Sequence, residues 1–295
     1  MLLTTLGGPC RLEEIPDFIK RFLGRELPPP ALKGVIDRYR LIGGFSPLPG
    51  ITGQQAERLG EILGGDYICR PAFRYSRPFI EEAIEDMVKV EVRCIIFLIL
   101  SPFYTRVTTG DYINAAQAHM EKKSLSLPVE FIHSWYNEPL FLRSWEEKIK
   151  GEAFDEDAFY LFSAHSLPLK HSDEPYQRQI VETVERLAAL AGIRNHALGW
   201  QSIPPNPVEP WITPTVEEKI DAIAAAGFRS LIQVPIGFTA DHIETLYDVD
   251  ITHRQYALAR ALSFRRVPSL NAGDTFIRAL KEMVIKFEGK VRVSP

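Results

Sequence analysis

Short apolar runs alternate along the chain with longer stretches in which apolar residues recur at helical spacing. Strands of nearly continuous apolar character that alternate with helices are typical of parallel sheets covered on both faces, so we expect an α/β fold. Open sheets of this kind bind ligands beyond the carboxyl ends of their strands. The short runs predict strands at Leu2–Leu6, Asp66–Arg70, Cys94–Leu100, Val129–Ile132, Phe159–Ser163, His196–Trp200, Leu231–Pro235 and Ser263–Val267. The longer stretches predict helices at Gln54–Leu63, Pro78–Val88, Tyr112–Lys122, Tyr176–Ala191 and Val216–Ala226.

The two halves of the sequence resemble each other. "LLTTLGGP" opens the first half and "LFSAHSLP" the second, and "IIFLILSPFYT" is echoed by "LIQVPIGFTAD". We therefore predict two similar Rossmann-like domains, over residues 1–145 and 146–273, each a parallel sheet flanked by helices, with a cleft between them. A final helix over residues 274–295 can pack back on the first domain. The proline-rich segment "ELPPPALKG" (26–34) predicts a loop or a stiff turn.

Composition narrows the class of protein. The 295 residues suit about two domains, and 45% hydrophobic with 24% charged residues is an ordinary globular balance. A net charge of -4 argues against a nucleic-acid-binding protein, for which a basic surface is expected. Cys10, Cys69 and Cys94 are odd in number and far apart, so the sequence predicts neither a disulfide framework nor a zinc or iron–sulfur site.

No segment of the sequence predicts a membrane span. The densest apolar run, Cys94–Leu100, is far shorter than the roughly 20 residues that a spanning helix needs. The first residues, "MLLTTLGG", are strand-like and leave no room for a signal peptide. We expect a cytoplasmic protein, and peripheral membrane contact stays open.

One histidine stands at an unusual place. In "YLFSAHSLPLKH" an apolar strand runs into small polar residues and His165. Histidine titrates near neutral pH and binds metals, although a histidine that merely caps a strand is the simpler alternative. The sequence lacks G-x-G-x-x-G, G-x-x-x-x-G-K-[ST] and G-x-S-x-G, which removes support for nucleotide binding and for a serine hydrolase.

A second segment, residues 234–254, is dense in ionisable groups directly after an apolar strand. Glu244 and Asp248 are four residues apart, so on a helix both carboxylates point the same way and need neutralising. An exposed acidic helix face is the alternative. Carboxylate and imidazole ligands suit Fe(II), Mn(II) or Zn(II), and the absence of nearby cysteine disfavours a closed structural zinc site. The other ionisable residues of the segment are Asp241, His242, Asp250 and His253.

Taken together, these motifs resemble those of ferrochelatases, the enzymes that insert Fe(II) into a porphyrin in haem synthesis. The resemblance covers nearly the whole chain in order, and the last of its segments is the most specific. The segments are "LLTTLGGP", "DRYRLIGGFSPL", "SPFYTRVTTGDYINA", "FSAHSLP", "GWQSIPPNPVEPWITP" and "GFTADHIETLYDVDI". The resemblance implies two chelatase-type domains.

The resemblance also implies roles for particular residues. His165 and Glu244 match the catalytic histidine and the carboxylate that faces it, and both are expected to contact the metal. Asp248 matches an outer metal ligand, with Asp241 and His242 extending the same polar route less firmly; Thr252 stands where some relatives carry a further acid. The positions that match porphyrin or outer-cation contacts are Arg38, Ser46, Tyr104, Thr108, Thr109, Trp200 and Trp211. For the aromatic residues among them a place in the core is the alternative, and for Arg38 an ordinary surface arginine.

The expected reaction joins porphyrin and Fe(II) to give haem and two protons, with iron as substrate and no permanently bound cofactor or iron–sulfur cluster. Some bacterial relatives that use coproporphyrin carry a tyrosine before the "G-[GT]-P" turn, where this chain has Leu6. We therefore expect protoporphyrin IX. A coproporphyrin III ferrochelatase, another tetrapyrrole chelatase, for example one using cobalt, and a non-catalytic haem or porphyrin carrier are the alternatives. Porphyrin and ferrous iron are the expected partners, and the sequence leaves monomer and homodimer open.

Overall fold

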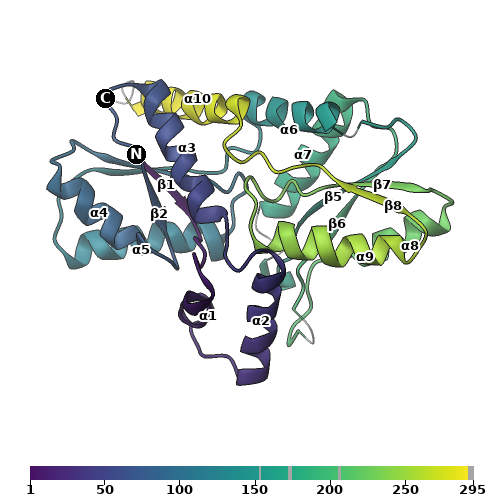
Figure 1. Ribbon diagram of the computed structural model, residues 1–295. Coiled ribbons are helices and arrows are strands. Elements are labelled where there is room, and N and C mark those ends of the chain that lie inside the picture. Colours follow the sequence, from purple (N-terminus) through teal and green to yellow (C-terminus); the bar gives the residue numbers. More distant parts are fainter. Residues whose placement is uncertain (153, 172–174, 205–206, 292–295) are drawn as a thin grey trace. The chain divides into compact units, whose positions relative to one another are not determined.

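The chain folds as two compact units. The computed structural model describes residues 1–152, 154–171, 175–204 and 207–291 (Figure 1). Unit 1 comprises Met1–Trp135 with Asn271–Pro295, and unit 2 comprises Tyr136–Leu270. The domain boundary that the sequence predicts after residue 145 falls inside helix α6 (Pro139–Glu152), which packs on α7 (Tyr176–Ala191) within unit 2. Of the predicted final helix, residues 292–295 lie outside the described part of the chain.

Unit 1 is built on a four-stranded parallel sheet of order β2-β1-β3-β4. The strands are β1 (Leu2–Thr5), β2 (Arg70–Phe73), β3 (Ile95–Ile99) and β4 (Val129–Ile132). In the register, Leu2 pairs with Arg70 on one side and with Phe97 on the other. Since β1 and β3 are buried on both faces, both need a helical cover.

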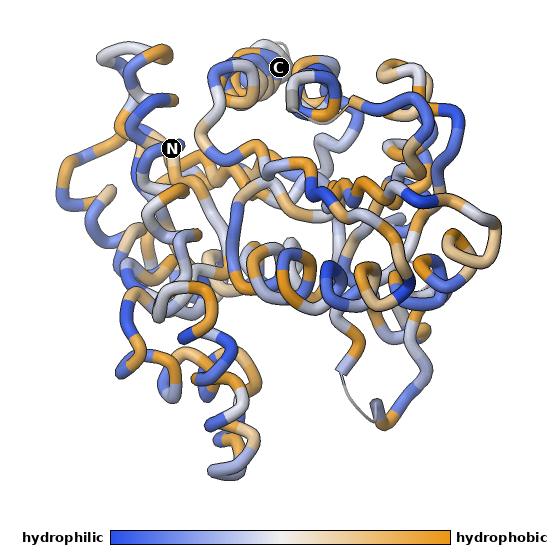
Figure 2. The backbone as a smooth tube through the Cα atoms, turned by 45° about the vertical axis from the view of Figure 1, so that its right-hand side comes forward, coloured by the Kyte–Doolittle hydropathy of each residue, from blue (hydrophilic) through white to orange (hydrophobic). Residues whose placement is uncertain are grey.

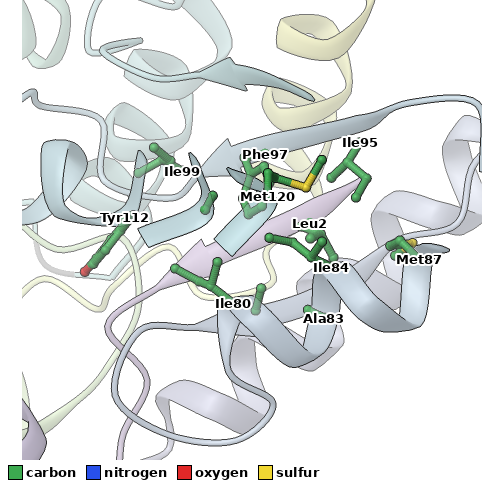
Figure 3. Packing of buried hydrophobic residues seen from close by; sticks show 12 residues of the cluster. Leu2, Ile80, Ala83, Ile84, Met87, Ile95, Phe97, Ile99, Tyr112 and Met120 are labelled. Carbon is green, nitrogen blue, oxygen red and sulfur yellow. The ribbon is translucent and has the colours of Figure 1, made fainter. Parts of the chain in front are cut away.

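One face of this sheet packs on α4 (Ile80–Lys89) and α5 (Asp111–Lys122). Figure 3 shows Leu2 and Phe97 from the sheet meeting Ile84 and Met120 from these helices. Side chains alternate between the faces of a strand, so Leu3 and Leu98 are buried on the other side. There α3 (Leu48–Leu63) contacts β1 and β2, and α10 (Asp274–Val291) contacts α3 and β4.

Unit 2 repeats this topology with the strand order β6-β5-β7-β8, again all parallel. Its strands are β5 (Phe159–His165), β6 (His196–Gln201), β7 (Ser230–Val234) and β8 (Ser263–Arg266). Helices α8 (Val216–Ala225) and α9 (Arg254–Leu258) contribute Ile220 and Ala257 to a core that includes Leu161 and Leu231 from the sheet. In Figure 2 the helical coils alternate between orange and blue, as expected for helices with one apolar and one polar face.

The third strand of each sheet is followed by a π-helical segment. In unit 1 this is η2 (Arg106–Gly110), which leads into α5, and in unit 2 it is η4 (Glu244–His253), which leads into α9. π-Helical turns are rare and are frequently found at functional sites. Both segments therefore mark the carboxyl edges of their sheets as places to look for function.

The predicted strands and helices match the structure closely, with two corrections. The predicted strand Asp66–Arg70 is wrong, because β2 begins at Arg70 and continues through Pro71, which an edge strand tolerates. The predicted loop 26–34 is wrong in its second half, because α2 (Pro29–Leu41) begins with two prolines at its first turn, where no backbone N–H is needed. The list of predicted helices also lacked α1 (Ile15–Leu23), α2, α6 and α9. Within the described ranges, no helix is long and apolar enough to cross a membrane.

Candidate active site

His165 is the last residue of β5, at the carboxyl edge of the sheet of unit 2. Ser163 and Ala164 before it are completely buried, whereas the His165 side chain remains about one-third exposed at 32%. The hydroxyl of Tyr176 donates a hydrogen bond of 3.0 Å to the His165 main-chain oxygen. Burial and then the nearby charge of Glu244 raise the pKa of Tyr176, so its hydroxyl stays a donor. The hydroxyl of Tyr176, at the start of α7, thus fixes the strand end that carries His165.

The imidazole of His165 has a defined orientation. Its Nδ1 lies against the main-chain oxygen of Ser166, and a carbonyl oxygen only accepts, so Nδ1 carries the hydrogen. The neutral ring then has its lone pair on Nε2. This atom faces Oε1 of Glu244 at 3.6 Å. Nε2 and Oε1 both present a lone pair and neither carries a hydrogen in this state. Their approach therefore favours a cation between them, either a proton or a metal ion.

Glu244 begins η4 and is approached by a second imidazole. Nε2 of His242 lies 3.2 Å from Oε2 of Glu244, while Nδ1 of His242 donates to the main-chain oxygen of Ala240 at 3.1 Å. Burial raises the pKa of Glu244, but the charge of His165 and the hydrogen bond and charge of His242 outweigh it and hold the pKa at about 2. The carboxylate is therefore ionised throughout the physiological range and can stabilise a proton on either imidazole.

The pair is suited to taking up protons and to meeting a metal transiently. His165 and His242 approach different oxygens of Glu244 rather than one common point. Within the described residues, no group of three or more His, Cys, Asp and Glu side chains is arranged to hold a metal ion. The site is thus unlike a closed structural metal centre and leaves ligand positions for another molecule.

The approach of the two strand ends depends on Gly237. A Cβ atom at this position would lie 2.9 Å from the Cα of Ala164 and 3.0 Å from its Cβ. The Gly237 N–H donates to the main-chain oxygen of Ser163 at 3.2 Å. Because no side chain intervenes, the segment after β7 runs directly against the backbone of β5, just before His165.

The further acids of the segment 234–254 have different surroundings. Asp248 accepts a hydrogen bond of 2.7 Å from the hydroxyl of Ser202. Asp241 and Asp250 instead form ion pairs with Arg266 of β8, at 2.9 Å and 2.7 Å. The Arg266 side chain is only 12% exposed, so this ion-pair network fastens η4 to the sheet. Its geometry gives Asp241 and Asp250 a structural role, while Asp248 stays beside the strand ends.

The two predicted cleft tryptophans occupy different environments. Trp211 lies beside the candidate catalytic pair, with its ring centroid 6.3 Å from that of His165. Trp200 is 4% exposed and packs on Tyr176 at a centroid distance of 5.8 Å. The geometry favours a ligand-facing position for Trp211 and the core alternative for Trp200.

The remaining predicted contacts belong to unit 1. Ser46 is buried and its side chain lies against Gly8, where a Cβ atom would collide with it. The Ser46 hydroxyl accepts a hydrogen bond from the Leu48 N–H at the start of α3. Thr108 and Thr109 lie in η2. The Thr108 N–H donates to the Thr105 hydroxyl at 3.0 Å, and the Thr109 hydroxyl lies within 3.5 Å of the Phe103 main-chain oxygen.

Two more predicted residues complete unit 1. Tyr104 follows β3, and its ring lies 5.6 Å from that of His133, the residue after β4. Burial lowers the pKa of His133, which keeps this imidazole neutral near pH 7. Arg38 is exposed on α2. Tyr104 and the threonines of η2 therefore gather at the carboxyl edge of the sheet, whereas Arg38 stands on a surface helix.

Sequence reasoning missed several residues around the pair. Tyr176, Gln201, Ser202 and Arg266 all contact His165 or the ionisable segment, yet none was singled out. Gln201 and Ser202 stand inside the motif "GWQSIPPNPVEPWITP", which gave a signal for them, but only its tryptophans were chosen. Nothing local in the sequence marks Arg266, because its partners come from other elements.

Comparison with known proteins identifies the family. A profile of the ferrochelatase family matches residues 1–287. The chain is 35% identical to coproporphyrin III ferrochelatase 1 of Bacillus cereus (strain ATCC 10987 / NRS 248), covering 97% of this chain and 96% of the relative. It is 33% identical to the ferrochelatase of Geobacter sp. (strain M21), with 96% of each chain covered. The chain belongs to the ferrochelatase family, whose members are lyases that insert a metal into a porphyrin in haem biosynthesis.

Solved structures with the same fold support the architecture. SirB from Bacillus subtilis, described with Fe3+, matches with a TM-score of 0.60 at 13% identity, over 99% of this chain and 96% of the other. CbiX, described as the terminal enzyme for siroheme biosynthesis in denitrifying bacteria, matches with a TM-score of 0.53 at 12% identity, over 81% of this chain and 92% of the other. The predicted fold, two parallel sheets flanked by helices in the chelatase manner, is confirmed.

Proposed function

We propose that the protein inserts ferrous iron into coproporphyrin III, with His165 and Glu244 as the catalytic pair. The observation that carries the proposal is the arrangement at the carboxyl edge of the second sheet. There, Nε2 of His165 faces Oε1 of Glu244 at 3.6 Å, and His242 binds the other carboxylate oxygen. Family membership supplies the reaction class, and this pair supplies groups suited to it.

The chemistry requires two pyrrole N–H groups to lose their protons as the metal enters the ring. His165 can accept a proton on Nε2, because its Nδ1–H is already engaged by the Ser166 carbonyl. Glu244, ionised above a pKa of about 2, stabilises the resulting imidazolium, while His242 contacts its other carboxylate oxygen. His165 accepts the two protons one at a time and releases each to solvent from its partly exposed ring before it takes up the next. Asp248 is the candidate for meeting the incoming cation farther along η4.

The choice of porphyrin follows the relatives. Relatives named coproporphyrin III ferrochelatase match along almost the whole chain, which favours coproporphyrin III over protoporphyrin IX. Leu6 is the specific observation for protoporphyrin IX, because its apolar side chain has no oxygen for an axial iron ligand. The two porphyrins differ in how many carboxylate groups stand on the ring edge, so rim contacts decide between them.

The test is anaerobic metal insertion followed by visible absorbance. Coproporphyrin III and protoporphyrin IX are compared as porphyrins, and Fe(II), Co(II) and Zn(II) as metals. We expect the highest kcat/KM with coproporphyrin III and Fe(II). A higher kcat/KM with protoporphyrin IX would contradict the proposed substrate and support the porphyrin that Leu6 favours. Tight porphyrin binding with no insertion of any metal would instead define a carrier.

A further inference from the structure

Gln201 and Ser202 stand at the end of β6, directly beside β5. Gln201 is the Cα partner of His165 in the parallel register, and the Ser166 N–H donates to its main-chain oxygen at 2.8 Å. Residues paired in this way project their side chains to the same face of a sheet. The side chain of Gln201 therefore stands on the face that carries His165.

The side chain of Gln201 is buried, with 1% of the residue exposed. Its Nε2 donates to the main-chain oxygen of Glu244 at 3.3 Å, and since a carbonyl only accepts, this contact assigns the amide orientation. The other atom, Oε1, is buried and has no hydrogen-bond partner among the residues that the structure describes. Buried acceptors are nearly always satisfied in folded proteins, so this one calls for a donor.

Ser202 has an unusual backbone conformation. Its φ of 64° lies in the left-handed region, which is uncommon for residues other than glycine. In that conformation its hydroxyl donates to Oδ2 of Asp248 at 2.7 Å. Strained residues of this kind persist where the surroundings hold them, and they cluster at functional sites.

We propose that Gln201 and Ser202 position the two carboxylates of η4, and that Oε1 of Gln201 accepts a hydrogen bond from a reactant during metal insertion. Gln201 holds Glu244 opposite His165 through the main chain, and Ser202 orients Asp248. The donor is a water molecule bound to the incoming cation, because an oxygen buried this deeply is out of reach of the inner N–H groups of a rigid porphyrin ring. This inference rests on the proposed function, because it assigns positioning residues to that same reaction.

The first test replaces Gln201. Gln201→Met keeps the length but removes donor and acceptor, and Gln255→Met makes the same change at an exposed position of α9. We expect Gln201→Met to lower kcat for iron insertion by about 10- to 100-fold, as outer-shell changes at metal sites do, with Gln255→Met unchanged. A rise in the KM for Fe(II) alone indicates a metal-bound water. A rise in the Kd for metal-free porphyrin, read by fluorescence, would instead point to a porphyrin donor and overturn the metal-bound water.

Gln201→Glu separates positioning from packing. The new carboxyl can donate to the Glu244 carbonyl only when it is protonated, so activity should be partly retained at low pH and decline as pH rises. A packing role predicts an unaltered pH profile instead. If Gln201→Met retains kcat and both affinities within twofold of the wild type, the role of Gln201 is refuted. Wild-type protein that inserts no iron would refute the proposed function instead, so the two failures are distinguishable.

The second test uses the strain at Ser202. Ser202→Gly removes the hydroxyl and relieves the left-handed conformation, whereas Ser202→Ala removes the hydroxyl and keeps the strain. We expect both variants to raise the KM for Fe(II) several-fold, although Ser202→Gly has the higher Tm. Ser263→Ala, which removes an exposed hydroxyl that donates to Arg229, is the control. Activity that follows Tm across the variants would overturn the role of Ser202.

Discussion

The π-helical segments after β3 and β7 occupy equivalent places in two sheets of the same topology, yet they are held in opposite ways. In unit 1, η2 is held by neighbours, because the Thr105 hydroxyl accepts from Thr108 three residues on. In unit 2, η4 is held by side chains from distant strands, Ser202 after β6 and Arg266 of β8. The contact described for η2 thus comes from a sequence neighbour, whereas the carboxylates of η4 are held by a donor and a charge from other elements of the sheet.

The largest effect should follow from the loss of His165, the proton acceptor that faces Glu244 of η4 from the end of β5. His165→Ala takes away the proton acceptor and should lower kcat for iron insertion by about 10²- to 10⁴-fold, while metal-free porphyrin still binds. Anaerobic absorbance assays measure the first quantity and porphyrin fluorescence the second. Thr108→Val is the counterpart in η2 and should change kcat by less than tenfold. Comparable losses of kcat in both variants would contradict the assignment of the catalytic groups to the strand end beside η4.

Arg266→Gln tests whether distant charges hold η4. It leaves Asp241 and Asp250 without their partner in a partly buried site, which should destabilise unit 2 by about 3 kcal/mol. Arg265→Gln is a matched control, because that neighbouring arginine is 45% exposed and its ion pair with Asp155 should contribute under about 1 kcal/mol. Urea denaturation measures both. Equal midpoints for the two variants would contradict a structural role for the Arg266 network.

His253, at the end of η4, predicts an acid sensitivity of unit 2. It is 2% exposed, and burial lowers its pKa to about 4. The unfolded imidazole binds a proton near pH 6.5, so unfolding takes up a proton between these values. Stability should therefore fall by up to about 3 kcal/mol as pH falls from 6.5 to 4, and this contribution should level off below pH 4.

The variant His253→Asn isolates this contribution. Its amide can still meet Gln233, which lies 3.1 Å from Nδ1 of His253 in the wild type. The difference in stability between wild type and variant should shrink from pH 7 to pH 4, as measured by urea denaturation at each pH. A difference that stays constant over this range would exclude His253 as the source of the acid sensitivity.

Thr105→Val should give the smallest effect. It removes the hydroxyl that accepts from the Thr108 N–H at the start of η2, which should destabilise unit 1 by about 1 kcal/mol. Iron insertion should stay within a few-fold of the wild type, because the change is confined to one turn. Thermal denaturation and the insertion assay measure the two quantities. A loss of stability as large as that of Arg266→Gln would show that η2 also depends on more than its neighbours.

Most of the fold follows from periodicity, because buried parallel strands such as β3 and β7 are continuous apolar runs. β2 was misplaced, since Arg70 and Pro71 hide the pattern of an edge strand. His165 and Glu244 were found by their positions after strand ends and by the family resemblance. Their actual partners were harder to predict.

Gln201, Tyr176 and Arg266 act through contacts that only the folded sheet creates. Gln201 meets Glu244 because β6 lies beside β5, and Arg266 meets Asp241 because β8 lies beside β7. Helical spacing predicts that Glu244 and Asp248 lie on one side of a helix. No local pattern predicts that Asp241 and Asp250 form ion pairs with Arg266. Which strands pair in a sheet depends on contacts between residues far apart in the chain, so it cannot be predicted from local patterns in one sequence.

Gly237 has a consequence for anyone who screens this protein by mutagenesis. Any side chain there would collide with the backbone of Ala164, so larger residues should abolish activity although no atom of Gly237 takes part in proton transfer. A loss-of-function screen would then rank this glycine with His165 and Glu244. Porphyrin-binding and folding measurements on the same variants would separate a misplaced strand end from a missing reactive group. The geometry of the site thus depends in part on a side chain that the sequence leaves out.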